Sequence, residues 1–148
     1  IGDGNNNMSN SFIEAAVKFK FNLKIGCPKK YSPNNKILRW ASNNKTKIFV
    51  TKDPREAAKD ADCIMTDKWV SMNDKVNKKA KKKSLKDYQV NKKLFKLAKT
   101  ECIFMHCLPV GRGEEVTDDI IDGKKSVVWQ QAHNRIHAQK SIINWCLN

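Results

Sequence analysis

The sequence predicts an α/β domain in which two layers of helices enclose a mainly parallel sheet, a three-layer αβα arrangement. Short apolar runs of strand length alternate along the chain with longer segments that carry apolar residues at helical spacing. Strands separated in this way by helices pair in parallel through right-handed crossovers. The 148 residues are enough for one domain with its own core.

The first half of the chain supplies three helices and three strands of this pattern. Ser9 or Asn10 is suited to cap a first helix that runs to about Phe19, because either side chain can accept from free backbone N–H groups. Asp53 and Pro54 mark the start of the third helix, since proline fits the first helical turn. In chain order, the expected elements are a helix over 9–19, a strand over 21–27, a helix over 34–43, a strand over 47–51, a helix over 53–59 and a strand over 62–66.

The second half continues the alternation and completes a Rossmann-like domain. Pro109 ends an apolar run, which places His106 and Cys107 at the carboxyl end of a buried strand. Residues 1–4 resemble the end of a strand that enters a loop, so we expect 1–148 to be one domain of a larger protein. The other expected elements are two lysine-rich helical stretches within 74–99, a strand over 101–105, a short helix over 116–121, a final strand over 126–129 and a last helix over 134–147.

Composition favours a cytoplasmic protein. The net charge of +14 is concentrated in residues 75–99, which hold eleven lysines and the single acid Asp87. The five cysteines are odd in number and form no Cys-x-x-Cys pair, so we expect reduced thiols. No apolar run is long enough to span a membrane, and no leader-like segment opens the chain.

His106 and Cys107 are the residues best placed for chemistry, because ligands of open α/β sheets bind at the carboxyl ends of the strands. Neighbours on a strand point to opposite faces, so these two cannot form a nucleophile–base dyad with each other. We interpret Cys107 as a polar or thiolate group beside a substrate, with its ionisation favoured if Arg135 lies close. The alternatives are a structural cysteine in the core and a structural role for His106.

Two further polar segments follow predicted strands and are expected at the same sheet edge. Asp3-Gly-Asn-Asn-Asn7 lacks the Gly-x-Gly-x-x-Gly pattern, so no nicotinamide cofactor is expected. Its side-chain amides suit a zwitterionic ligand, although a helix-capping turn explains them equally well. In the second segment, Asp67 can pair with a cationic group, while Ser71 and the backbone at Met72 can donate to a carboxylate.

The last helix offers a third kind of site. If it begins in the segment 130–135, its free N–H groups and Arg135 would attract a phosphate or carboxylate, whereas the alternative is a solvated arginine. His133 and His137 lie four residues apart, but no further ligands accompany them, so we expect no metal. The lysine block could bind nucleic acid, but with only Tyr88 and Phe95 for base stacking a solvated helical face is the preferred interpretation.

Four motifs, taken together, resemble the ornithine carbamoyltransferase family over essentially the whole chain. They are Asp3-Gly-Asn-Asn6, Asp67-x-Trp-Val-Ser-Met72, His106-Cys-Leu-Pro109 and Asn134-Arg135. The combination of His-Cys-Leu-Pro with a Ser-Met loop is specific, since aspartate carbamoyltransferases carry His-Pro-Leu-Pro and lack the Ser-Met loop. Putrescine-specific relatives also differ at that loop.

The resemblance implies the carboxyl-terminal, ornithine-binding domain of a two-domain enzyme that makes citrulline and phosphate from ornithine and carbamoyl phosphate for arginine biosynthesis. It implies that Asn6, Asp67, Ser71 and Met72 hold the α-amino and α-carboxylate groups. Cys107 and Leu108 would line the meeting point of the substrates, and Arg135 would help to bind carbamoyl phosphate. Asp67, Cys107 and Arg135 are the predicted catalytic residues. No cofactor is implied.

The chain also departs from the family. Asn73 stands where the family usually has glycine, and Gln131-Ala-His-Asn-Arg135 replaces Glu-Ala-Glu-Asn-Arg. The family's Ser-x-Arg-Thr-Arg motif, which belongs to its amino-terminal domain, does not occur here, so we expect these 148 residues alone to be inactive. The family is typically a homotrimer. Open alternatives are a carbamoyltransferase for another amine, an amino-acid sensor without turnover and a nucleic-acid-binding module.

Overall fold

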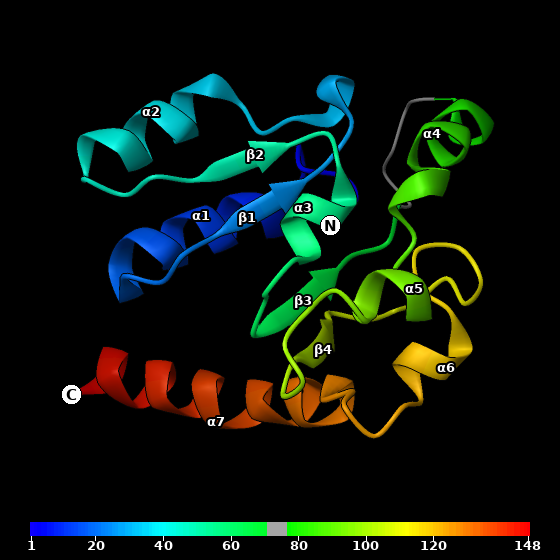
Figure 1. The fold of residues 1–148 in the computed structure, drawn as a ribbon. Coiled ribbons are helices and arrows are strands. Elements are labelled where there is room, and N and C mark those ends of the chain that lie inside the picture. The colour runs from blue at the N-terminus through cyan, green and yellow to red at the C-terminus, as the bar shows by residue number, and fades with distance from the viewer. Residues whose placement is uncertain (71–76) are drawn as a thin grey trace.

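The α/β class is confirmed by a computed structural model, which describes residues 1–70 and 77–148. Within these residues the strands form two parallel pairs, β1 with β2 and β3 with β4 (Figure 1). Each pair is joined by a helical crossover, as expected for strands separated by helices. The strands are β1 (Lys24–Gly26), β2 (Phe49–Thr51), β3 (Cys63–Thr66) and β4 (Ile103–His106).

Helices cover both faces of the first strand pair. Ile13 of α1 and Ala41 of α2 pack with Ile25 of β1 in one core cluster. Gly26, the next residue on β1, faces the opposite side and lies against Ala57 of α3. The first helices are α1 (Asn7–Phe19), η1 (Lys29–Tyr31), α2 (Asn35–Asn43) and α3 (Pro54–Ala58).

A second core joins β3 and β4 to the helices that follow them. Ile64 of β3 and Phe104 of β4 are fully or almost fully buried against Leu94 of α5, Ile121 of α6 and Val128 of α7. Apolar residues at alternate strand positions thus reach this core. The later helices are α4 (Lys78–Leu85), η2 (Lys86–Tyr88), α5 (Lys92–Phe95), α6 (Asp118–Ile121) and α7 (Val128–Leu147).

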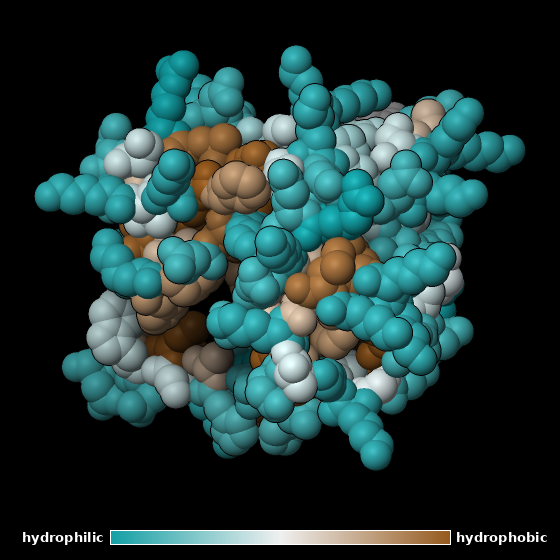
Figure 2. All heavy atoms as spheres, viewed as in Figure 1, coloured by the Kyte–Doolittle hydropathy of each residue, from teal (hydrophilic) through white to brown (hydrophobic). Residues whose placement is uncertain are grey.

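A hydrophobic cleft of about 820 Å³ separates the two strand pairs. Leu23 and Ile25 line one side, Ile64 and Met65 line the other, and Figure 2 shows the brown hollow left of centre. Around this cleft, the described backbone links the pairs only through residues 1–2: the amine of Ile1 donates to the carbonyl of Met65 at 2.8 Å and the N–H of Gly2 to that of Gly26 at 2.9 Å. Residues 1–2 thus lie between β1 and β3 and connect the two parallel pairs through backbone hydrogen bonds.

The boundaries of two helices differ from those predicted. The predicted strand over 126–129 is wrong, because only Ser126 forms a bridge, to Phe104, and α7 begins at Val128. α1 begins at Asn7, and its cap is Asn6 rather than Ser9 or Asn10. A four-residue apolar run fits a short strand and the first turn of a helix equally well, which explains the first error.

α7 extends along the lower edge of the molecule in Figure 1 and packs on the fold only near its start. Its apolar side chains beyond that point are exposed: Ile136, Ile142, Ile143, Trp145 and Leu147. None of the described helices combines the length and hydropathy that crossing a membrane requires.

Candidate functional site

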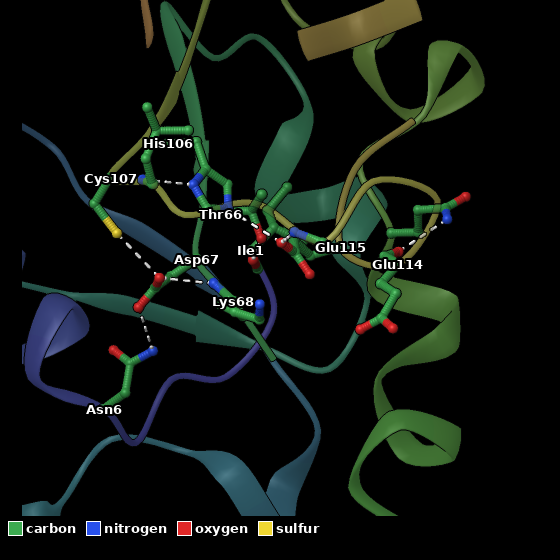
Figure 3. Close-up of polar contacts among 12 residues, drawn as sticks. Ile1, Asn6, Thr66, Asp67, Lys68, His106, Cys107, Glu114 and Glu115 are labelled. Atoms are coloured by element: carbon green, nitrogen blue, oxygen red, sulfur yellow. Dashed lines mark hydrogen bonds and ion pairs between the residues drawn. The ribbon is translucent and has the colours of Figure 1, made fainter. Parts of the chain in front are cut away.

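The parallel pairing of β3 with β4 brings Asp67 and Cys107 together. Thr66 and His106 are register partners at the carboxyl ends of the two strands, so the residues that follow them emerge side by side. The thiol of Cys107 donates to Oδ1 of Asp67 at 3.0 Å (Figure 3). Both side chains are half-buried, which leaves this edge open to a ligand.

Asn6 joins this pair from the start of α1. Its Oδ1 accepts the N–H of Ser9 at 2.8 Å and caps the helix. This capping bond fixes the orientation of the amide, because the backbone N–H requires the oxygen. Nδ2 therefore faces Asp67 and donates to its Oδ2 at 3.4 Å, as Figure 3 shows. We call these three side chains the Asn6–Asp67–Cys107 cluster.

The cluster presents a carboxylate between an amide and a thiol. Oδ1 of Asp67 also accepts the N–H of Lys68 at 2.7 Å, so the carboxylate is held by neighbours on several sides. Such an oriented, half-buried carboxylate can bind an ammonium group. Sequence reasoning placed Asn6, Asp67 and Cys107 at one sheet edge, and the structure brings them into contact. Their contacts with a substrate remain predictions.

Cys107 is a neutral thiol, which corrects the expectation that it could ionise beside Arg135. Burial and the hydrogen bond to the Asp67 carboxylate raise its pKa to about 12. Arg135 is exposed and lies seven residues after Val128, so it is inside α7 and not at its free N–H groups. The described residues give Arg135 no hydrogen bond or ion pair with the cluster. The predicted anion site at the start of the last helix is therefore not formed by Arg135.

Leu108 follows the cluster with an unusual backbone. Its φ is +51°, in the left-handed region that leucine rarely adopts, and its peptide bond to Pro109 is cis. The N–H of Leu108 donates to Nδ1 of His106 at 2.9 Å. Leu108 is half-buried and follows Cys107 directly in the chain, and its place at the meeting point of the substrates stays a prediction.

Sequence reasoning missed Glu115. It is fully buried, as is His106, and its Oε1 lies 3.3 Å from Nε2 of His106. Glu115 also accepts the N–H of Gly111. Nothing in the sequence distinguishes it from the adjacent Glu114, which is half-buried and paired with Lys82.

Gln131 shows how one departure from the family pattern is accommodated. Its Oε1 accepts the backbone N–H of His106 at 3.0 Å and so ties α7 to the end of β4. An amide oxygen fills this acceptor role as well as a carboxylate oxygen could. Gln131, which stands where the family usually has Glu, thus supports the backbone of His106 in this chain.

The predicted residues Ser71 and Met72 lie outside the described residues. Before them, Trp69 and Val70 are buried with Tyr31. Beyond them, α4 is tied to the Asp3 segment by an ion pair of 2.7 Å between Lys81 and Asp3, both of which are nearly buried.

The lysine block is only partly the solvated face that its composition predicted. Lys81 is buried, and Lys82 is paired with Glu114, while Lys78, Lys79 and Lys83 are exposed. Tyr88 is buried and donates to the carbonyl of Lys52 at 2.6 Å, so it presents no free ring for a base.

No metal-binding group of three His, Cys, Asp or Glu side chains occurs in residues 1–70 and 77–148. His133 and His137 meet only each other, with ring centroids 5.2 Å apart. In these parts of the chain the cysteines are free.

Comparisons with known proteins match nearly the whole chain. Residues 1–146 match the family model described as aspartate/ornithine carbamoyltransferase, Asp/Orn binding domain. The chain is 50% identical over 146 residues to the ornithine carbamoyltransferase of Rhodopseudomonas palustris, which covers 99% of this chain and 46% of that protein. The chain thus spans about half the length of the curated relatives it matches.

Solved structures give the same result. The ornithine carbamoyltransferase from Pyrococcus furiosus superposes with a TM-score of 0.86 at 44% identity, covering 96% of this chain and 46% of that chain. The anabolic enzyme of that name from Campylobacter jejuni gives a TM-score of 0.91 at 33% identity, covering 97% of this chain and 48% of the other.

Proposed function

Because this chain belongs to the aspartate/ornithine carbamoyltransferase family, we propose that it is the ornithine-binding half of an ornithine carbamoyltransferase. The enzyme transfers the carbamoyl group of carbamoyl phosphate to the δ-amine of L-ornithine and releases L-citrulline and phosphate, a step of arginine biosynthesis. The single observation that supports this most strongly is the contact of Asp67 with both Asn6 and Cys107.

The cluster suits one end of a diamino acid. The Asp67 carboxylate, oriented by Asn6, binds the α-ammonium group of ornithine. Ser71 and Met72 hold the α-carboxylate. With the backbone of ornithine fixed in this way, its side chain extends along the strand ends towards Cys107 and Leu108, and the δ-nitrogen meets the carbamoyl carbon there.

The δ-amine must lose a proton before it can attack, because an alkyl ammonium has a pKa of about 10.4 in water. Desolvation in the closed site favours the neutral amine. Cys107 is not the base, since its own pKa of about 12 keeps it protonated. It donates to Asp67 and so keeps that carboxylate in place for the α-ammonium group, while the proton of the δ-ammonium group passes to solvent water as the amine enters the site.

The transfer itself needs no covalent enzyme intermediate. The lone pair of the δ-nitrogen attacks the carbamoyl carbon, and the carbonyl oxygen becomes an oxyanion that cationic and N–H donors stabilise. The bond from carbon to the phosphate oxygen then breaks. Phosphate leaves with that electron pair, and the nitrogen gives its remaining extra proton to the departing phosphate.

Carbamoyl phosphate is bound mainly by another part of the enzyme, which carries the family's Ser-x-Arg-Thr-Arg motif. Arg135 reaches the phosphate from α7 when the two parts close. The same part provides the cover for the exposed apolar side chains of α7, and the complete enzyme is a cytoplasmic homotrimer. The five free cysteines support a reducing compartment.

The decisive experiment is citrulline formation by the full-length protein with carbamoyl phosphate and ornithine, putrescine or acetylornithine as acceptor. Citrulline from ornithine, with little carbamoylation of the other two amines, is the expected result. A preference for another amine would replace ornithine as substrate. Tight ornithine binding without any product would indicate an amino-acid sensor. The 148 residues alone are expected to give no citrulline.

A further inference from the structure

We propose that His106 and Glu115 form a positioning pair that holds the turn over residues 107–111 in the shape that keeps Cys107 against Asp67. The inference rests on the proposed function, because holding Cys107 against Asp67 matters for the carbamoyl transfer. Neither residue belongs to the Asn6–Asp67–Cys107 cluster. Both act through the backbone of the turn.

The pair accepts backbone hydrogen bonds near both ends of the turn. Nδ1 of His106 accepts the N–H of Leu108 at 2.9 Å, and Oε1 of Glu115 accepts the N–H of Gly111. Because both side chains are fully buried, these acceptors are shielded from competing water. The backbone donors on either side of Pro109 are thereby fixed by side chains that contact each other.

The protonation pattern of His106 follows from these contacts. Since Nδ1 accepts a hydrogen bond, the hydrogen of the neutral ring is on Nε2, which lies 3.3 Å from Oε1 of Glu115. The same carboxyl oxygen accepts the N–H of Gly111 and contacts Nε2, but Nε2 is buried and makes no hydrogen bond to the described residues. The other oxygen, Oε2, is buried and has no hydrogen-bond partner among the described residues.

Stability does not explain such a pair. A buried carboxylate with one unsatisfied oxygen is costly, and replacing buried polar pairs by apolar residues is often neutral or stabilising. We explain the buried His106 and Glu115 by their effect on the backbone path of the turn. Leu108 needs that support because its φ of +51° is unfavourable for leucine.

The backbone of Gly111 also lies unusually close to the Glu115 carboxylate. A Cβ at this position would lie 2.7 Å from Oε2 of Glu115, so the backbone comes as near as a glycine allows. The other side of the frame is fixed by Gln131, whose Oε1 holds the N–H of His106 at 3.0 Å. The start of the turn is thus anchored to both β4 and α7, which are regular elements.

Two matched pairs of variants in the full-length protein test the proposal. Glu115→Gln keeps an oxygen at Oε1, while Glu115→Leu has similar size and no acceptor. His106→Asn keeps an acceptor in the place of Nδ1, while His106→Leu has none. Val116→Ala is the control, because Val116 is a fully buried neighbour of Glu115 in the apolar core.

Three quantities are measured for each variant: kcat for citrulline formation, thermal stability, and the pH dependence of Cys107 alkylation followed by peptide mass spectrometry. We expect each leucine variant to lose about 10- to 100-fold in kcat relative to its polar counterpart, as displacement of a reacting group by about 1 Å does. Cys107 should then be alkylated at lower pH than in the unchanged protein, because its thiol leaves Asp67. Val116→Ala should lower stability and leave both other measurements unchanged.

Equal kcat and equal Cys107 alkylation within each pair would overturn the proposal, and either pair suffices if one variant fails to fold. A loss of kcat that merely follows thermal stability, with Val116→Ala included, would also overturn it. The alkylation profile separates this inference from the proposed function. A shifted Cys107 profile in a protein that makes no citrulline would leave the positioning pair intact and remove the proposed reaction.

Discussion

At the scale of single residues, Asp67 is the centre of the site. Its carboxylate accepts hydrogen bonds from the side chains of Asn6 and Cys107, which are distant in sequence, and from the backbone N–H of the adjacent Lys68. Each bond to a charged acceptor contributes about 1.5–3 kcal/mol, so the carboxylate fixes its neighbours as much as they fix it. Removing the Asp67 carboxylate should therefore affect Asn6, Cys107 and the backbone at Lys68.

Asp67→Asn in the full-length protein should lower kcat/KM for ornithine by about 10- to 100-fold, since an amide cannot replace the charge that binds the ammonium group. The loss of that charge should also lower the pKa of Cys107 towards its ordinary value. Steady-state citrulline assays and thiol alkylation measure the two effects. Asp62→Asn is the control, because Asp62 is an exposed carboxylate paired with Lys99. Unchanged kinetics in Asp67→Asn would contradict the assigned role.

The raised pKa of Cys107 predicts a loss of stability in alkali. Between the ordinary pKa of 9.0 and the folded value of about 12, the unfolded chain has released the thiol proton and the folded chain has kept it. The unfolded state then binds fewer protons, so the free energy of unfolding falls as pH rises through this window. Urea midpoints from about pH 8 to 11 should fall less steeply in Cys107→Ser. Equal slopes in the two proteins would refute this, and Cys146→Ser serves as the exposed control.

At the scale of secondary structure, α1 and the site share one residue. Asn6 caps the helix with its oxygen and faces Asp67 with its nitrogen. The helix therefore supplies the orientation of a binding group, and the binding group stabilises the helix. The two roles can be separated, because serine caps helices nearly as well as asparagine but is too short to reach Asp67.

Asn6→Ser should keep the free energy of unfolding within about 0.5 kcal/mol, and Asn6→Ala should lower it by about 1 kcal/mol. Both should raise KM for ornithine, because neither side chain can donate to Asp67. Urea unfolding and citrulline kinetics distinguish the two roles. If Asn6→Ser retained the original KM, the amide nitrogen would have no part in binding.

The packing of α3 on β1 gives a prediction about stability alone. A Cβ on Gly26 would lie 2.9 Å from that of Ala57 and 3.3 Å from Cα of Pro54, so Gly26→Ala should lower the free energy of unfolding by about 1–3 kcal/mol. Adding Ala57→Gly removes the first collision. The double variant should therefore lose less free energy of unfolding than the sum of the losses in the two single variants, as a double-mutant cycle in urea can measure. Simple additivity would show that the contact is not the cause.

The elements could be predicted where the pattern was long or punctuated. β3 and β4 follow from apolar runs that end at polar residues, and the start of α3 follows from Asp53 and Pro54. The cap of α1 was wrong because several polar residues in a row can all cap a helix.

At the scale of the whole molecule, the sequence predicted the fold class, the family and the meeting of Asn6, Asp67 and Cys107, since all three follow strand ends or helix starts at one sheet edge. Glu115 was missed because burial of one acid beside an exposed neighbour depends on tertiary packing. Arg135 was misplaced because the start of α7 was predicted too late in the chain.

The exposed end of α7 predicts self-association of these 148 residues when they are produced alone. Trp145 and Leu147 are 81% and 80% exposed, and such apolar surface favours contact between copies. Sedimentation velocity over a range of concentrations should show oligomers. Trp145→Gln with Leu147→Gln should shift the distribution towards monomer, whereas Lys140→Gln, a change of an exposed charged residue on the same helix, should not. A concentration-independent monomer would disprove the expectation.

The hydrogen bond from the Cys107 sulfur to Asp67 also bears on oxidative damage. Peroxide attacks the thiolate form of cysteine, and the raised pKa of Cys107 keeps its thiol protonated at neutral pH. The carboxylate that organises the site therefore also shields its sulfur from conversion to a sulfenic acid. At neutral pH the Cys107 sulfur should therefore react with peroxide more slowly than an exposed cysteine such as Cys146.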